Sequence, residues 1–280
     1  MPTRFEIHYR RSIVSGIRFG HGPKLMIGFH GFADKATAFM PLSSALKDRY
    51  TVICLDLPFH GETRWRGGDF GRKDLVALVE YLLAETGHQR FSLMGHSMGG
   101  RIVLNLLPVF RQKIEGLFLF ASAGLHSHLL LRRDWVPMLF RRWARQRLVR
   151  LSKPPFWFYW FKGLRLVPRY AAGLLEVHFT TFNRRKRLLS TWVSMSDFEI
   201  NPDRHRRLIQ RCGIPVYVYM GEQDQAVPVS DGESFVRDLP SAHLRILPEG
   251  HNLMTHELCQ ALRTDLDAAG QTPPSSSPQT

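Results

Sequence analysis

The sequence has few cysteines and no long apolar run. Its 280 residues include three scattered cysteines, Cys54, Cys212 and Cys259. This odd number, without Cys-x-x-Cys spacing, argues against a disulfide framework or a cysteine metal site and favours a reducing compartment. No window approaches the roughly 20 uncharged apolar residues that cross a bilayer, and no apolar segment typical of a signal peptide begins the chain. We therefore expect a cytoplasmic protein.

Acidic side chains are also scarce, with 24 Asp and Glu against 38 Lys and Arg, which gives a net charge of +14. Residues 125–200 hold 15 basic and 4 acidic side chains (+11) and five of the six tryptophans. The rest of the chain holds 23 basic and 20 acidic side chains (+3). The distribution predicts a near-neutral body that carries a basic, aromatic insert, and it favours an acidic or amphiphilic partner.

The body alternates between strand and helix patterns. Apolar and β-branched runs predict strands at Phe5–Tyr9, Ile13–Phe19, Leu25–Phe29, Tyr50–Leu57, Phe91–His96, Gly116–Ala121, Pro215–Met220 and Leu244–Leu247. Helices are expected at Lys35–Arg49, Arg72–Thr86, Met98–Phe110, Val229–Leu239 and Thr255–Ala269. Such alternation is typical of a mostly parallel sheet with helices on both faces. We expect this α/β body at residues 1–124 and 201–268, with a disordered Pro/Ser-rich tail at 269–280.

The sequence Gly95-His96-Ser97-Met98-Gly99-Gly100 lies between a predicted strand and a predicted helix. This is the strand–turn–helix context of a G-x-S-x-G nucleophile elbow. The tight turn would lift the hydroxyl of Ser97 clear of the sheet and leave no room for side chains at Gly95 and Gly99. Ser97 is therefore the predicted nucleophile, and its neighbour His96 is expected to be a packing residue.

A serine hydroxyl needs a neighbouring base, and the base needs an acid to orient it. His251 follows the last predicted strand, and Asp224 follows the strand before it. Because sites in parallel sheets gather at the carboxyl ends of strands, we predict His251 as the base and Asp224 as the acid. Glu222 is the alternative acid.

Acyl chemistry also needs two donors for a developing oxyanion. The first predicted donor is the backbone N–H of Phe32, which follows a strand that ends in His30-Gly31. The second is the N–H of Met98, next to the nucleophile.

These segments together resemble the alpha/beta-hydrolase superfamily. The matching segments, in family order, are HGF at 30–32, DLPFHGET at 56–63, GHSMGG at 95–100, GEQD at 221–224 and GHN at 250–252. The resemblance implies an eight-stranded sheet with a helical cap inserted after strand six, which is where the basic insert 125–200 lies. Phe59-His60 stands where the family usually has a glycine. Relatives that are haloalkane dehalogenases or epoxide hydrolases carry aspartate at the elbow, whereas Ser97 suits acyl transfer.

The aromatic insert favours an apolar acyl or aryl pocket. We therefore predict a serine hydrolase that cleaves an ester or thioester of an apolar acyl group, without metal or cofactor. A C–C bond hydrolase or an elimination lyase with the same triad remains an alternative, as does a non-catalytic binding protein. The arginines of the insert and the aromatic run Phe156–Phe161 would suit an acidic carrier protein or an anionic membrane surface, where the protein would be peripheral. Nucleic acid is not expected as a partner, because no binding motif accompanies the charge.

Overall fold

The computed structural model describes residues 2–126, 138–151, 173 and 176–271. Its centre is one eight-stranded sheet with the strand order β1-β2-β4-β3-β5-β6-β7-β8. The strands are β1 (Thr3–Tyr9), β2 (Ser12–Phe19), β3 (Lys24–Phe29), β4 (Tyr50–Leu55), β5 (Phe91–His96), β6 (Ile114–Phe120), β7 (Val216–Gly221) and β8 (Ala242–Leu247). β2 runs antiparallel to β1 and β4, and all the other neighbours are parallel. The predicted alpha/beta-hydrolase fold is confirmed.

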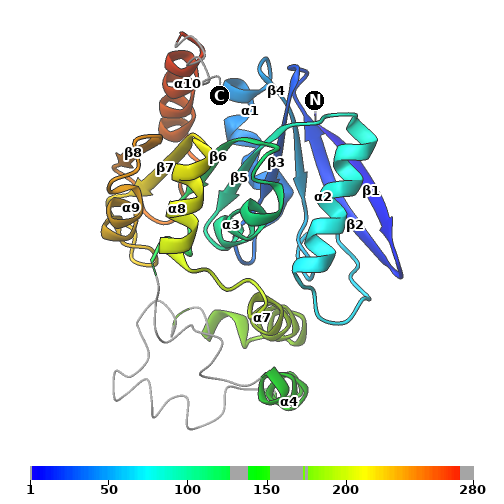
Figure 1. Ribbon diagram of the computed structural model, residues 1–280. Coiled ribbons are helices and arrows are strands. Elements are labelled where there is room, and N and C mark those ends of the chain that lie inside the picture. Colours follow the sequence, from blue (N-terminus) through cyan, green and yellow to red (C-terminus); the bar gives the residue numbers. More distant parts are fainter. Residues whose placement is uncertain (1, 127–137, 152–172, 174–175, 272–280) are drawn as a thin grey trace.

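Both faces of the sheet are buried, and alternate residues of each strand supply the two halves of the core. On β3, Leu25, Ile27 and Phe29 belong to one apolar cluster, whereas Met26 belongs to the other. The first face is covered by α2 (Arg72–Thr86), α3 (Met98–Phe110), α8 (Pro202–Cys212) and α9 (Val229–Val236). The second face is covered by η1 (Ala36–Leu42), α1 (Ser43–Leu46) and α10 (His256–Gln271) (Figure 1). Within the described residues, no helix is long and apolar enough to span a membrane.

The prediction of one continuous helix at Lys35–Arg49 is wrong. The chain makes a 3₁₀ helix, η1, and then the single α-helical turn α1. Pro41 lies inside η1. Proline has no N–H to donate and its ring meets the carbonyl four residues before it, which disfavours a continuous α-helix through this position.

The basic insert follows β6. Its described helices are α4 (Met138–Leu148) and α7 (Phe182–Met195), which pack against each other at one end of the sheet (Figure 1). Asp69 of the body accepts hydrogen bonds from Arg142, at 2.7 Å, and from Arg145. The N–H of Phe70 donates to Ser194 Oγ at 3.1 Å. These contacts attach both helices to the loop before α2.

Several predictions fall outside the described residues. They include the aromatic run Phe156–Phe161 and most of the predicted tail. The first three residues of that tail, 269–271, belong to α10, which ends at Gln271.

Candidate active site

Ser97 stands between β5 and α3 in a backbone conformation that side chains rarely adopt, with φ 51° and ψ −116°. Three hydrogen bonds hold it there. Its N–H donates to the carbonyl of Phe120 at 2.9 Å, and its own carbonyl accepts from Ala123 at 2.9 Å and from Gly100 at 3.0 Å. Neighbouring strands thus fix a strained residue, as is common where a side chain must be presented for chemistry.

The glycines of the elbow allow close backbone approach. A Cβ on Gly95 would lie 2.6 Å from the backbone of Gly99, and one on Gly99 would lie 1.8 Å from the carbonyl oxygen of Phe29. A Cβ on Gly100 would lie 1.7 Å from Ser122 Oγ. No side chain fits at these positions, so the start of α3 packs directly on the ends of β3 and β6.

The structure brings the three predicted triad residues together. His251 Nε2 lies 2.8 Å from Ser97 Oγ, and His251 Nδ1 lies 2.8 Å from Asp224 Oδ2. With Nδ1–H donating to the carboxylate, Nε2 carries the lone pair that accepts the serine proton. The residues come from loops after β5, β7 and β8, at the carboxyl edge of the sheet.

Asp224 is held as a carboxylate. Its Oδ1 accepts the N–H groups of Ala226 at 2.7 Å and Val227 at 3.0 Å, which leaves Oδ2 for His251. Burial alone would raise the pKa of Asp224, but the hydrogen bonds from His251, Val227 and Ala226 outweigh it and place the pKa below its ordinary value. Glu222, the alternative acid, is exposed to solvent, whereas the Asp224 side chain is fully buried.

His96 lies beside the triad without joining it. Its Nε2–H donates to the backbone carbonyl of His251 at 3.0 Å, and its pKa is lowered mainly by burial. The imidazole is thus a neutral packing group that holds the backbone of the base. This is the position expected of it from the sequence.

Both predicted oxyanion donors belong to segments that lie next to the nucleophile. Gly31 is close enough to Ser97 that an added Cβ would lie 3.3 Å from Ser97 Cβ, which places the Phe32 backbone beside the elbow. Met98 is the first residue of α3. Within the described part of the chain, neither the Phe32 nor the Met98 N–H donates to a protein acceptor. Both remain free for a ligand oxygen.

His30 fixes this loop and was missed as a site residue from the sequence. Its Nδ1–H donates to the carbonyl of Gly31 at 2.7 Å, and its Nε2 accepts the N–H of Leu57 at 3.0 Å. This pair of bonds needs a neutral imidazole. Burial lowers the pKa of His30 to about 4, against a smaller opposite effect of the bond to Gly31. The only available signal was its position immediately before Gly31.

Strained backbone gathers at this edge of the sheet. Six described non-glycine residues have positive φ, and four of them follow the ends of β3, β4, β5 and β6, namely Ala33, Phe59, Ser97 and Ala121. Positive φ costs free energy in residues with a Cβ, so such clustering is characteristic of a functional site.

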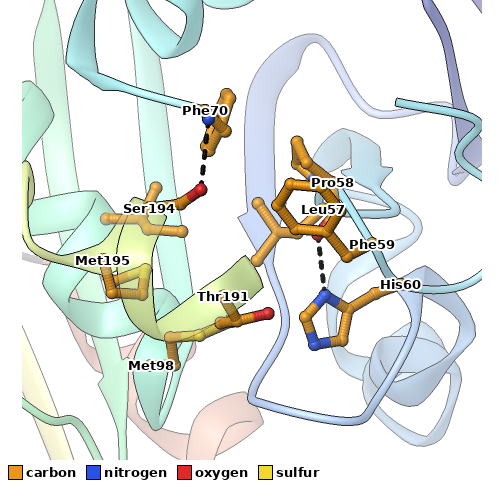
Figure 2. Close-up of a pocket in the computed structure, with 10 residues that line it drawn as sticks. Leu57, Pro58, Phe59, His60, Phe70, Met98, Thr191, Ser194 and Met195 are labelled. Atoms are coloured by element: carbon orange, nitrogen blue, oxygen red, sulfur yellow. Dashed lines mark hydrogen bonds between the residues drawn. The ribbon is translucent and has the colours of Figure 1, made fainter. Parts of the chain in front are cut away.

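A narrow apolar slot lies next to Met98. Figure 2 shows Met98 of α3 facing Leu57, Pro58 and Phe59 of the loop after β4, with Thr191 of α7 between them. The slot has a volume of about 10 Å³, which is room for roughly one water molecule. The insert therefore contributes to the wall beside the predicted oxyanion donor. His178, which precedes α7, also packs edge-on against the ring of Phe32 at 4.9 Å between centroids.

Within the described ranges, no group of three His, Cys, Asp or Glu side chains is arranged to hold a metal ion.

The alpha/beta hydrolase fold family matches residues 24–257, which is most of the chain, and the chain belongs to this family. The uncharacterized hydrolase YugF of Bacillus subtilis is 25% identical over 267 residues, covering 89% of this chain and 92% of that protein. The dihydrolipoyllysine-residue acetyltransferase component of the acetoin cleaving system of Pseudomonas putida is 27% identical over 254 residues, covering 88% of this chain. The match spans only 63% of that relative's length.

Among solved structures, a thermophilic esterase from Thermogutta terrifontis has a TM-score of 0.69 and 19% identity, covering 95% of this chain and 98% of that one. This likeness shows a shared fold. Membership of the family supports hydrolase activity.

Proposed function

We propose that this chain is a serine hydrolase that cleaves an ester or thioester of an apolar acyl group through an acyl-enzyme. The observation that carries the proposal is the continuous hydrogen-bonded path from Ser97 through His251 to Asp224, with 2.8 Å at each step. A nucleophile, a base and an orienting carboxylate in hydrogen-bond contact are the parts that acyl transfer requires.

In the proposed mechanism, His251 Nε2 takes the proton of Ser97 Oγ as the oxygen attacks the acyl carbonyl. The backbone N–H groups of Phe32 and Met98 stabilise the oxyanion that forms. The His251 imidazolium, stabilised by Asp224, then protonates the departing alcohol or thiol. Water repeats the sequence on the acyl-enzyme, with His251 as its base, and releases the acid.

The apolar character of the acyl group is inferred from the wall beside Met98. Its apolar members are Leu57, Pro58, Phe59, Phe70, Ile102 and Met195. A panel of chromogenic esters with graded acyl length tests the proposal. We expect turnover that depends on acyl length and disappears in Ser97→Ala, and product analysis of a C–C bond substrate in the same panel tests the lyase alternative. No hydrolysis of any ester or thioester would reject the proposal.

We further propose that residues 125–200 act as a cap that shapes the acyl pocket and meets an acidic carrier protein or an anionic membrane surface from the cytoplasm. Support comes from the contact of His178 with Phe32 and from the position of Thr191, Ser194 and Met195 in the wall of the slot. The identity of the partner is tested by measuring the salt dependence of turnover for an acyl group on an acidic carrier protein and, separately, for the same acyl group on anionic vesicles.

A further inference from the structure

A second, larger cavity shares one wall residue, Phe59, with the apolar slot beside Met98. Its volume is about 350 Å³, and its walls come from the loop after β4 and from the first two turns of α7. Three of its lining side chains are cationic: Arg64, Lys186 and Arg187. No lining residue is acidic. The cavity therefore concentrates positive charge in a volume large enough for a phosphate group and its substituent.

Lys186 and Arg187 of α7 lie in this cavity without an acidic partner among the residues that the structure describes. Within the described part of the chain, no ion pair reaches Lys186 or Arg187. The Nε of Arg187 is buried and has no hydrogen-bond partner among the described residues. A buried donor without an acceptor is costly, and it is uncommon in native structures unless a ligand or water completes it.

The charge of Arg187 also acts on its surroundings. The pKa of His178 is lowered first by burial and then by the positive charges of Arg187 and Arg184. By contrast, Arg64 contacts Glu6 at 3.3 Å, but both side chains are well exposed, and such pairs contribute little to stability. Arg64 can therefore exchange this partner for a ligand.

The floor of the cavity is rigid. Thr63 Oγ1 donates to the carbonyl of Asp56 at 2.6 Å and accepts the N–H of Ser15 at 2.9 Å. The backbone of Arg64 pairs with that of Ile13 in both directions. The backbone that carries Arg64 therefore needs no rearrangement when the side chain binds an anion.

Phe59 connects this cavity with the predicted catalytic centre. It lines both the cavity and the slot that contains Met98, and it holds a left-handed backbone with φ 71°. Two residues further on, only glycine fits at position 61, because a Cβ on Gly61 would lie 2.1 Å from the carboxyl carbon of Asp56. Phe59, with its strained backbone, thus lies between the apolar slot and the basic cavity.

We propose that the cavity lined by Arg64, Lys186 and Arg187 binds a phosphate group of the substrate, whose apolar acyl part lies on the Ser97 side of Phe59. Arginine forks match phosphate oxygens in pairs, and Lys186 adds a point charge. The proposal rests on the proposed function for the reaction, but the binding of the phosphate does not depend on turnover. It restricts the substrate to an acyl ester or thioester with a phosphate at some distance from the acyl carbon.

Two matched pairs of substrates test the proposal and distinguish the sources of phosphate. The first pair is an acyl-pantetheine and the same acyl group on 4′-phosphopantetheine; the second is a monoacylglycerol and its phosphate. In the preferred pair, kcat/KM for the phosphorylated member should be about tenfold higher or more, since charge-assisted hydrogen bonds are involved. Arg187→Gln should bring this ratio close to one. Arg184→Gln removes the same charge from an exposed residue of α7 outside the cavity and should leave the ratio unchanged.

A binding measurement separates this proposal from the proposed reaction. Calorimetry on Ser97→Ala with free 4′-phosphopantetheine and glycerol 3-phosphate should show binding that is lost in the Ser97→Ala/Arg187→Gln double variant. Phosphate binding without turnover of any ester would reject the proposed function and keep the cavity. Turnover with a ratio near one in both pairs, or equal losses in the Arg187 and Arg184 variants, would overturn the phosphate site.

Discussion

His251 Nε2 and Ser97 Oγ lie 2.8 Å apart although 154 positions separate them in the sequence. The loop after β8 and the turn after β5 meet because parallel strands end at one edge of the sheet. His96, the residue before the nucleophile, stabilises this contact because its Nε2–H donates a hydrogen bond to the backbone carbonyl of His251. The contact is therefore built into the fold and does not depend on a ligand.

The acid of the triad is tested by comparing two neighbouring carboxylates. Asp224→Asn should lower kcat by roughly 10⁴-fold, because an amide in place of the Oδ2 acceptor favours the wrong imidazole tautomer. Glu222→Gln should change kcat less than about twofold, because Glu222 is exposed and does not contact His251. Steady-state kinetics on a chromogenic ester measures both. A larger loss in the Glu222 variant would reassign the acid.

The close packing at Gly99 of the elbow can be tested by substitution. Gly99→Ala should destabilise the protein strongly, by about 3 kcal/mol or more, because its Cβ would lie 1.8 Å from the Phe29 carbonyl oxygen. Gly87→Ala provides a control with open space around the Cβ, although its φ of 71° adds strain without a clash. Urea unfolding of the two variants compares steric overlap with strain alone, and equal stabilities would contradict the packing described.

Acid should weaken the fold through buried neutral histidines. His30 has a pKa of about 4 in the folded protein against an ordinary value of 6.5, so the unfolded chain takes up the proton first as the pH falls. The stability from this group is complete above pH 6.5 and is lost as the pH falls towards 4, by roughly 3 kcal/mol in all. Burial likewise lowers the pKa of His60 to about 3.

Urea unfolding at pH 7.5 and 4.5 measures this loss. His30→Asn keeps a side-chain donor but cannot take up a proton, so its stability should change less between the two pH values than that of the wild type. His8→Asn, at an exposed site on β1, should behave as the wild type does. Identical pH slopes for the two variants would show that His30 does not carry the effect.

The attachment of α4 can be tested at Asp69. Asp69→Ala removes the shared acceptor of Arg142 and Arg145, so the amides of α4 should exchange hydrogen faster by about tenfold. Asp48→Ala is the control, since its contact with His21, at 3.4 Å, joins two exposed side chains. Exchange followed by mass spectrometry measures both. Unchanged exchange in α4 would mean that other contacts hold the helix.

Much of this architecture could be predicted because its signals are local. Predicted and observed boundaries agree for Arg72–Thr86, Phe91–His96 and Met98–Phe110, where periodicity and the elbow motif act together. Ser97, His251 and Asp224 could be chosen because each follows a recognisable strand. The helix α8 was missed, although Asn201 as N-cap, a proline after it and Gly213 in the left-handed region mark both of its ends.

Other features depend on contacts that no local pattern encodes. The role of His30 comes from the N–H of Leu57, 27 residues away. The dense arginines of the insert looked alike in sequence, yet Arg142 and Arg145 pair with Asp69 while Arg187 faces a cavity. Which charges are neutralised is decided by tertiary packing.

Covalent labelling tests most directly whether Ser97 is the nucleophile. A fluorophosphonate probe reacts with a serine that a neighbouring base activates. After digestion and mass spectrometry, the wild type should carry the label at Ser97 alone, and Ser97→Ala should take up none and lose several orders of magnitude in kcat. Labelling at another residue, or a fully active alanine variant, would contradict the account.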